Sequence, residues 1–376
     1  MTIPFHIPVY DQADATAFTQ SLLSGSIVGD GPVTRRVTPA LARDLGVRHA
    51  LLTPSCTHAL ELAMMALTLE PGDEVIVPSF TFVSSTNAIL RRGARVVFAD
   101  VDPATLTLTA DLAAPRIGAR TRAIMSVVYA GVSPDMDPIM TLASSRSITV
   151  VEDAAQGIAA TYRGRPAGTT GHMGCFSFHE TKNFSTGEGG AFVTNDDHLM
   201  QRAEIMREKG TNRKQFMLGL VDKYTWVDVG SSFLPPDPMA ALLESQLAKR
   251  ESIQARRRTI FERYSDAFHG LAHQGKLVLP FIPAYAGSNH HIYHVLMENE
   301  YVRNRALAFF REKGIGTTFH YLPLHLSPMG RAMGYGDGDF PVTESVSARL
   351  LRLPIYPGLT DEQQRNVIGA MNEFFA

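Results

Sequence analysis

Residues 150–195 constrain the fold most, because three short apolar segments follow one another there and each stops at polar residues. The first segment ends at Asp153, the second ends shortly before Lys182, and the third follows a glycine-rich turn at 187–190. Buried parallel strands have this composition and present polar side chains at their carboxyl ends. We therefore expect Asp153 at the end of one strand and Lys182 in a tight loop between two others.

A lysine and an aspartate at such positions are the pair that the chemistry of pyridoxal 5′-phosphate (PLP) requires. The amine can form a Schiff base with the cofactor aldehyde, and a carboxylate at the pyridine nitrogen keeps that nitrogen protonated, so that the ring accepts electrons. A single lysine is, however, most often a solvated surface charge. The residues alone leave both interpretations open.

Two motifs resemble those of the DegT/StrS family of PLP-dependent nucleotide-sugar aminotransferases: Glu-Asp-Ala-Ala-Gln at 152–156 and Ser-Phe-His-Glu-Thr-Lys-Asn at 177–183. The likeness runs from Gly29 to His325. It implies the α/β fold of aspartate aminotransferase (type I), with a large domain built on a mixed, mostly parallel seven-stranded sheet and a smaller α+β C-terminal domain. We expect the PLP-binding domain and the N-terminal segment over residues 1–236, and a long connecting helix with the small domain over residues 237–376.

The resemblance implies roles for individual residues around the cofactor. Lys182 is the catalytic residue and the cofactor's covalent anchor, and Asp153 meets the pyridine nitrogen. Phe82 stacks on the ring, where an aromatic face holds the cofactor plane. Gln156 contacts the phenolic oxygen.

The cofactor phosphate is expected where a short strand runs into an apolar helix over residues 59–69. Free backbone N–H groups and the helix dipole make such a helix start an anion site. Ser55 and Thr57 can equally serve there as helix caps, and the residues alone do not decide. The resemblance implies phosphate binding by Ser55, Cys56, Thr57 and Ser177.

Three further residues are predicted to contact the substrate: Gly31, Tyr129 and His325. Gly31 lies in a turn-rich loop, residues 24–32, that reaches the active-site mouth in relatives, and the loop with His325 closes over the sugar there. His320 and His325 flank Pro323 at a spacing that is not a helical ligand pair, so we expect no metal.

The second half of the chain shows helical periodicity over residues 238–272, which predicts one long helix. A strand at 291–297, a helix at 303–313 and a strand at 316–321 are expected to follow. Residues 210–236 lack periodicity, and relatives use this segment to reach the partner subunit's active site. The family's Gly-x-Asn-x-Arg pattern is absent at Gly230, which leaves Lys209 and Arg213 as candidates for the partner's phosphate contact by charge.

The composition limits the classes of binding partner that we expect. A net charge of −2 gives no reason to expect nucleic acid or an anionic membrane. The chain has two cysteines in apolar segments, and the first eight residues lack the basic and apolar regions of an export signal. We therefore expect a cytoplasmic protein.

The resemblance implies transfer of an amino group from L-glutamate to C4 of a dTDP-linked 4-keto-6-deoxy sugar, by a homodimer with shared active sites. The long matches at Phe176–Asn183, Glu208–Arg213 and Asp222–Trp226 are closest to enzymes that make 4-amino-4,6-dideoxygalactose for enterobacterial common antigen. Amination at C3 and formation of the gluco epimer stay open as alternatives. PLP-dependent sugar dehydratases carry histidine in place of Lys182, and a regulatory protein on the same scaffold is the non-enzymatic alternative.

Overall fold

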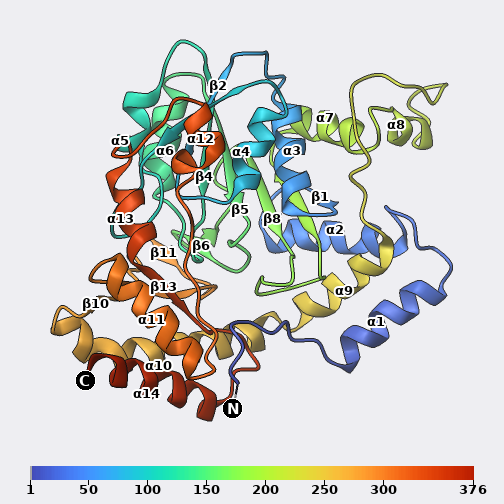
Figure 1. Ribbon diagram of the computed structural model, residues 1–376. Helices are drawn as coiled ribbons and strands as arrows, with labels where there is room; N and C mark the ends of the chain where they lie inside the picture. Colours follow the sequence, from blue (N-terminus) through green and yellow to red (C-terminus); the bar gives the residue numbers. More distant parts are fainter. Residues whose placement is uncertain (1) are drawn as a thin grey trace.

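The computed structural model describes residues 2–376, and a seven-stranded sheet lies at its centre (Figure 1). The strand order is β1-β9-β8-β5-β4-β2-β3. Strand β9 runs antiparallel to both of its neighbours, and all other adjacent pairs are parallel. The predicted mixed, mostly parallel seven-stranded sheet is therefore confirmed. The strands are β1 (His49–Thr53), β2 (Glu74–Pro78), β3 (Arg95–Ala99), β4 (Thr121–Val127), β5 (Thr149–Ala154), β8 (Met173–Ser177) and β9 (Gly190–Thr194).

Alternate residues of these strands enter different apolar clusters, because successive side chains of a strand point to opposite faces. Val75, Val77 and Val151 pack with helices α3, α4 and α7 on one face. On the other face, helices α2 and α9 cover the end of the sheet near β1, and α5 and α6 cover the remainder. These helices are α2 (Pro32–Asp44), α3 (Cys56–Ala66), α4 (Val83–Leu90), α5 (Ala110–Ala113), α6 (Met136–Ser144), α7 (Asp197–Arg207) and α9 (Asp237–Ala248).

A second, antiparallel sheet of three strands forms in the C-terminal part, with the order β10-β12-β13. Three helices share its apolar cluster: α10 (Arg250–His273), α11 (Glu300–Glu312) and α14 (Asp361–Phe375). The strands are β10 (Leu277–Val278), β12 (Tyr293–Met297) and β13 (Leu350–Leu353). The other α-helices and strands are α1 (Gln12–Leu23), α8 (Arg213–Met217), α12 (Pro328–Ala332), α13 (Pro341–Arg349) and the small sheet of β6 (Thr161–Tyr162), β7 (Arg165–Pro166) and β11 (Ala286–Gly287).

Two expected elements of the C-terminal part differ in the structure. The helix predicted over 238–272 is two helices, α9 and α10, that meet at Lys249. The Lys249 amine pairs with Asp11 and Asp14, so a tertiary contact with α1 holds the residue at which the helix breaks. The predicted strand at 316–321 is reduced to one bridge between Thr318 and Arg352.

The N-terminal segment lies against the C-terminal part of the chain, and both chain ends lie on the lower side of the molecule in Figure 1. Ile3 forms a parallel bridge with Ile315 and is buried in the same cluster as the second sheet. Residues 3–8 are thereby brought beside the loop that carries Lys182, because His6 Nε2 lies 2.8 Å from the carbonyl oxygen of Glu180.

None of the helices in residues 2–376 combines the length and the apolar composition needed to cross a bilayer.

Candidate active site

Asp153 lies near the carboxyl end of β5 and is 4% exposed. Its Oδ2 accepts a hydrogen bond of 2.6 Å from Ser85 Oγ, and its Oδ1 accepts one of 3.1 Å from the Ala155 backbone. The Ser85 hydroxyl lies 2.9 Å from that of Thr81, so a buried chain of hydroxyls supports the carboxylate. Burial raises the pKa of Asp153, and the Ser85 hydrogen bond opposes this rise.

Lys182 lies in the loop between β8 and β9, as predicted. Two hydrogen bonds of 2.8 Å tie the loop, from Phe178 N to Gly189 O and from Thr186 N to Phe178 O. Gly189 is required there, because a Cβ atom would lie 2.3 Å from Thr186 Oγ1. These contacts hold Lys182 in a fixed, half-buried position.

The surroundings of Lys182 favour a neutral amine. Burial lowers the pKa of Lys182, because it disfavours the charged ammonium, and the negative charge of Asp153 opposes this. Burial also raises the pKa of Cys56 well above its usual value, so the neighbouring thiol carries no charge at neutral pH. A larger share of the Lys182 amine is therefore nucleophilic than for an exposed lysine.

The start of α3 has the two predicted hydroxyl residues in different roles. Ser55 caps the helix, since its Oγ accepts a hydrogen bond of 3.2 Å from His58 N. Thr57 does not cap it, because its Oγ1 lies 2.8 Å from Ser84 Oγ at the start of α4. The backbone N–H groups of Cys56 and Thr57 belong to the first turn and have no acceptor within the helix.

Ser177 is brought to this corner by the sheet. It pairs with Gly190 across β8 and β9, and Gly190 packs on the first residues of α3, where a Cβ atom would lie 2.5 Å from Cys56 N. The Ser177 hydroxyl accepts a hydrogen bond of 3.3 Å from His179 N. Ser177 and the free N–H groups of α3 therefore lie at one end of the candidate site.

Phe82 and Gln156 both lie near Tyr321. The Phe82 ring is 57% exposed and its centroid lies 6.4 Å from that of Tyr321. The Gln156 amide donates to Tyr321 Oη at 3.1 Å and accepts from Ala130 N at 2.6 Å. Tyr129 is buried in the same wall, with its hydroxyl 3.3 Å from His320 Nδ1.

Gly31 and His325 are not brought to Lys182 by a contact. Gly31 is the N-cap residue of α2 and has no room for a side chain, because a Cβ atom would lie 2.5 Å from the Asp237 carboxylate that caps the helix. His325 is fully buried between Ser79 Oγ at 2.7 Å and Glu344 Oε1 at 3.1 Å. Both residues thus have structural partners, and their predicted substrate contacts rest on the resemblance alone.

The two cations considered for the partner's phosphate, Lys209 and Arg213, both pair with Glu208, at 3.1 and 3.4 Å. Both side chains are about half exposed, so another anion can replace Glu208 as their partner at little cost in free energy.

Sequence reasoning missed two residues of this region. Ser85 could have been found from its spacing, since it lies one helical turn after Thr81 at the start of the helix that follows a buried strand. Arg352 has a clearer signal, as the single charge in the strand sequence Leu-Leu-Arg-Leu.

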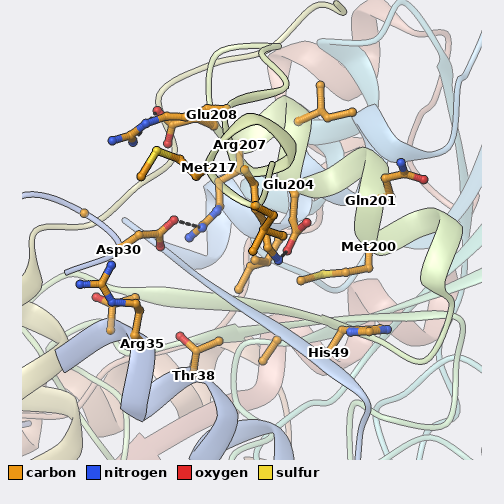
Figure 2. Close-up of a pocket in the computed structure, with 18 of the residues that line it drawn as sticks. Asp30, Arg35, Thr38, His49, Met200, Gln201, Glu204, Arg207, Glu208 and Met217 are labelled. Carbon is orange, nitrogen blue, oxygen red and sulfur yellow. Dashed lines mark hydrogen bonds and ion pairs between the residues drawn. The ribbon is translucent and has the colours of Figure 1, made fainter. Parts of the chain in front are cut away.

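A large cavity lies elsewhere, between α2, β1, α7 and α8 (Figure 2). Its volume is about 660 Å³, and its lining includes Gly31 and Arg213. Arg207 donates a hydrogen bond of 2.6 Å to Asp30 across it, as Figure 2 shows. Lys182 and Asp153 are not part of this cavity, so the chemistry that they suggest does not belong there.

The residues around Lys182 fit PLP. The buried Asp153 can face a pyridine nitrogen, the half-exposed ring of Phe82 offers a stacking face, and the α3 corner with Ser177 can receive a phosphate. Contacts join these groups into one site. The Thr57 hydroxyl contacts that of Ser84. In the sequence Ser84 lies between Phe82 and Ser85, and the Ser85 hydroxyl donates to Asp153.

Comparison with known proteins agrees with this geometry. Residues 8–372 match the model of the DegT/DnrJ/EryC1/StrS aminotransferase family. Over 379 residues the chain is 32% identical to the spore coat polysaccharide biosynthesis protein SpsC of Bacillus subtilis, with 99% of this chain and 96% of that protein covered.

Solved structures show the same fold. The aminotransferase TlmJ from Streptoalloteichus hindustanus superimposes with a TM-score of 0.91 at 34% identity, over 99% of this chain and 98% of that chain. A sugar aminotransferase described as putative, Spr1654 from Streptococcus pneumoniae, is known in a PLP form. It superimposes with a TM-score of 0.92 at 27% identity, over 100% of this chain and 98% of that chain. It is also known in a pyridoxamine form. The chain therefore belongs to the DegT/DnrJ/EryC1/StrS aminotransferase family, as a sugar aminotransferase that uses PLP.

Proposed function

We propose that this enzyme moves the amino group of L-glutamate to C4 of dTDP-4-keto-6-deoxy-D-glucose, giving dTDP-4-amino-4,6-dideoxy-D-galactose. The observation that carries the aminotransferase chemistry is the half-buried amine of Lys182, whose pKa is lowered by burial, in one site with the buried carboxylate of Asp153. The C4 position and the galacto product rest on the motif matches at 176–183, 208–213 and 222–226.

Each residue has a defined task in this reaction. When bound, PLP supplies an aldehyde for amine exchange and a ring that withdraws electrons. Lys182 Nζ would hold the cofactor and, when free, would act as the base that takes the proton from the donor's α-carbon. Asp153 would favour a protonated ring nitrogen, and Phe82 would offer its ring face to the cofactor ring. Gln156 has a second amide hydrogen for the phenolic oxygen.

The relative named for spore coat polysaccharide biosynthesis supports a sugar destined for a surface polysaccharide. We propose enterobacterial common antigen or lipopolysaccharide precursors as that destination. Amination at C3 and the gluco epimer are the alternatives, because the groups around Lys182 are compatible with each of them.

We further propose that two copies of the chain form a homodimer with shared active sites. Apolar side chains are exposed around the cavity of Figure 2, among them Val28 at 71%, Met217 at 72% and Leu218 at 63%. Trp226 and Leu220, on the segment that follows α8, are exposed by 74% and 70%. Such concentrated apolar exposure is typical of a surface that a partner covers, and a two-fold pair is the commonest partner arrangement.

The test combines a substrate panel with one variant. Purified protein is incubated with PLP, L-glutamate and dTDP-linked 3-keto and 4-keto sugars, and NMR of the product reports the aminated carbon and its configuration. We expect the 4-amino galacto product, and loss of turnover in Lys182→Ala by more than about 10³-fold. Lys276→Ala, at an exposed lysine, is the matched control.

Other products would identify the alternatives directly. A 3-amino product overturns the assigned position and a gluco product overturns the assigned configuration, but neither overturns the aminotransferase chemistry. A protein whose cofactor absorbance does not respond to L-glutamate or any other amino donor would be the regulatory alternative.

A further inference from the structure

Three buried polar side chains join the loop that carries Lys182 to the segment that precedes β12. They are Asn183, Asn289 and His291, which we call the latch, and their exposed fractions are 8%, 2% and 5%. Asn183 Nδ2 donates to Asn289 O at 2.9 Å, and Asn183 Oδ1 lies 2.9 Å from His291 Nδ1. Since an amide oxygen only accepts hydrogen bonds, His291 Nδ1 carries the proton in this arrangement. The imidazole is thus a donor to the residue that follows Lys182.

Asn289 continues the connection to the Gln156 side of the candidate site. Its Nδ2 donates to the carbonyl oxygens of Gln156 and Ile158, at 2.8 and 2.7 Å. Its Oδ1 packs on Gly131, where a Cβ atom would clash with it. Gly131 belongs to the turn at 129–132, whose backbone donates to the Gln156 side chain. Asn289 therefore holds both the backbone of Gln156 and the turn that orients its amide.

The latch is a complete hydrogen-bond network. Asn289 Oδ1 accepts from His291 N at 3.1 Å, so every side-chain nitrogen and oxygen of Asn183 and Asn289 has a partner. Apolar side chains of similar shape could stabilise the fold about equally well, but a satisfied polar network admits one arrangement of its members. His290, between the two latch residues, has a φ of 52°, a left-handed conformation that is unfavourable for residues other than glycine. The chain therefore accepts local strain where it presents Asn289 and His291.

The latch fixes Lys182 on the side that the loop itself does not hold. Within the loop, Lys182 N donates to His179 O at 2.9 Å. From outside, His6 lies 2.8 Å from the carbonyl oxygen of Glu180, two residues before the lysine. The Asn183 side chain supplies the hold on the following residue. Because the chain is fixed before and after Lys182, the direction in which the amine leaves the backbone is fixed as well.

His291 is a neutral donor in this position. Burial lowers the pKa of His291 well below its ordinary value, and the positive charge of Lys182 is the next largest cause. The effect of Lys182 shows that the amine and the imidazole are close enough to interact. The bond to Asn183 consequently keeps the same neutral donor throughout the physiological pH range.

We infer that His291 is a positioning residue for the Lys182 amine, acting through Asn183, and that Asn289 keeps this amine in register with Gln156. The inference rests on the proposed roles of Lys182 at the cofactor aldehyde and of Gln156 at the phenolic oxygen. These two groups are attached to neighbouring carbon atoms of the pyridine ring, so the residues that meet them must be held at a fixed separation. A displacement of about 1 Å can reduce turnover by about 100-fold.

The first experiment compares two ligands of the cofactor-free protein. PLP has the aldehyde that Lys182 captures, whereas pyridoxine 5′-phosphate has the same ring and phosphate with an alcohol in place of the aldehyde. In His291→Leu we expect the dissociation constant of PLP to rise by about 10-fold, the loss of one hydrogen bond. The dissociation constant of pyridoxine 5′-phosphate should stay unchanged, because its binding does not need the direction of the amine. Fluorescence titration measures both values.

Steady-state kinetics of the PLP-loaded enzyme gives a second readout. In His291→Leu, kcat should fall by about 100-fold while the KM values for the amino donor and the keto sugar stay unchanged, because positioning acts on the reaction step. Tyr264→Phe is the matched control. It removes a buried hydrogen bond of 3.0 Å to Pro354 O, so it should lower the melting temperature but change neither kcat nor the affinity for the two ligands.

Two conservative variants test the hydrogen bond itself and replace His291→Leu if that protein does not fold. His291→Asn keeps a neutral N–H donor at the δ position and should recover most of the affinity for PLP and most of kcat. His291→Gln is also neutral and polar, but its donor lies one carbon farther along the side chain, so it should be as impaired as His291→Leu.

Three outcomes would overturn the inference. Wild-type kcat and PLP affinity in His291→Leu and His291→Gln would make the latch purely structural. An equal loss of affinity for PLP and pyridoxine 5′-phosphate would mean that the pocket, and not the amine, is disturbed. Equal activity of His291→Asn and His291→Gln would exclude the bond to Asn183. Lys182→Ala separates these results from the proposed function: if it binds PLP as tightly as the wild type, the proposed anchor is wrong, whatever the latch does.

Discussion

The hydroxyl of Ser85 donates a 2.6 Å hydrogen bond to Oδ2 of Asp153, and neither residue is accessible to solvent beyond 4%. This bond does two things for a carboxylate that we propose faces a protonated ring nitrogen. It fixes the rotation of the side chain, and it stabilises the charged form against burial, which raises the pKa of Asp153.

Ser85→Ala should therefore lower kcat/KM by about 10- to 100-fold, the effect of losing a hydrogen bond to a charged group. The 15N chemical shift of labelled PLP should show a smaller protonated fraction of the ring nitrogen. Ser145→Ala removes a hydroxyl that bonds only the Leu142 carbonyl near a helix end, and should change neither value. Normal turnover and an unchanged 15N shift in Ser85→Ala would show that Asp153 needs no such support.

Phe82 offers a second test of the cofactor site. Its ring is 57% exposed, so truncation removes little packing from the cofactor-free protein. Phe82→Ala should raise the dissociation constant of PLP by about 10-fold, the loss of one aromatic stacking contact, with no fall in melting temperature before PLP is added. Fluorescence titration with PLP measures the dissociation constant. Phe281→Ala, at a ring with 53% exposure elsewhere on the surface, is the matched control.

The sequence predicts the positions of Lys182 and Asp153 because local patterns determine them. A short apolar run that ends in a polar residue forms a buried strand whose end lies at the sheet edge, whatever the rest of the chain does. The break between α9 and α10 has no such local signal, since neither glycine nor proline is present at Lys249 and the cause is a contact with α1. The guanidinium of Arg352 likewise lies over the ring of Phe5, 347 residues away, and no spacing rule connects the two.

Stability should depend on pH through His294, which is 8% exposed and has an unpaired Nδ1. Burial, with a smaller contribution from Arg352, lowers its pKa from 6.5 to about 4 in the folded chain. Between these values the unfolded chain binds the proton and the folded chain does not, so the free energy of unfolding falls as the pH decreases from 6.5 to 4. The full effect is about 3 kcal/mol, and it is absent above pH 6.5.

Urea denaturation at pH 4.5 and pH 7.5 measures this dependence. In His294→Leu the difference between the free energies of unfolding at the two pH values should be smaller than in the wild type by about 2 kcal/mol. The other buried histidines contribute equally to the pH dependence of both proteins. Any packing change caused by the substitution alters the free energy of unfolding equally at both pH values. An identical pH difference in the two proteins would contradict the assignment to His294.

The segment after α8 should hold the proposed homodimer together. Trp226 is 74% exposed, although its backbone is fixed by a bridge with Thr211, so the side chain is free to pack on a second copy. Trp226→Asp places a charge at that position, and light scattering should show the mass falling from twice 41.1 kDa toward 41.1 kDa. If the active sites are shared, the specific activity of the variant should also rise with protein concentration, because association restores the site by mass action. Tyr301→Asp, at an equally exposed aromatic residue on α11, should leave the mass unchanged. A Trp226→Asp protein that stays a dimer with full activity would place the interface elsewhere.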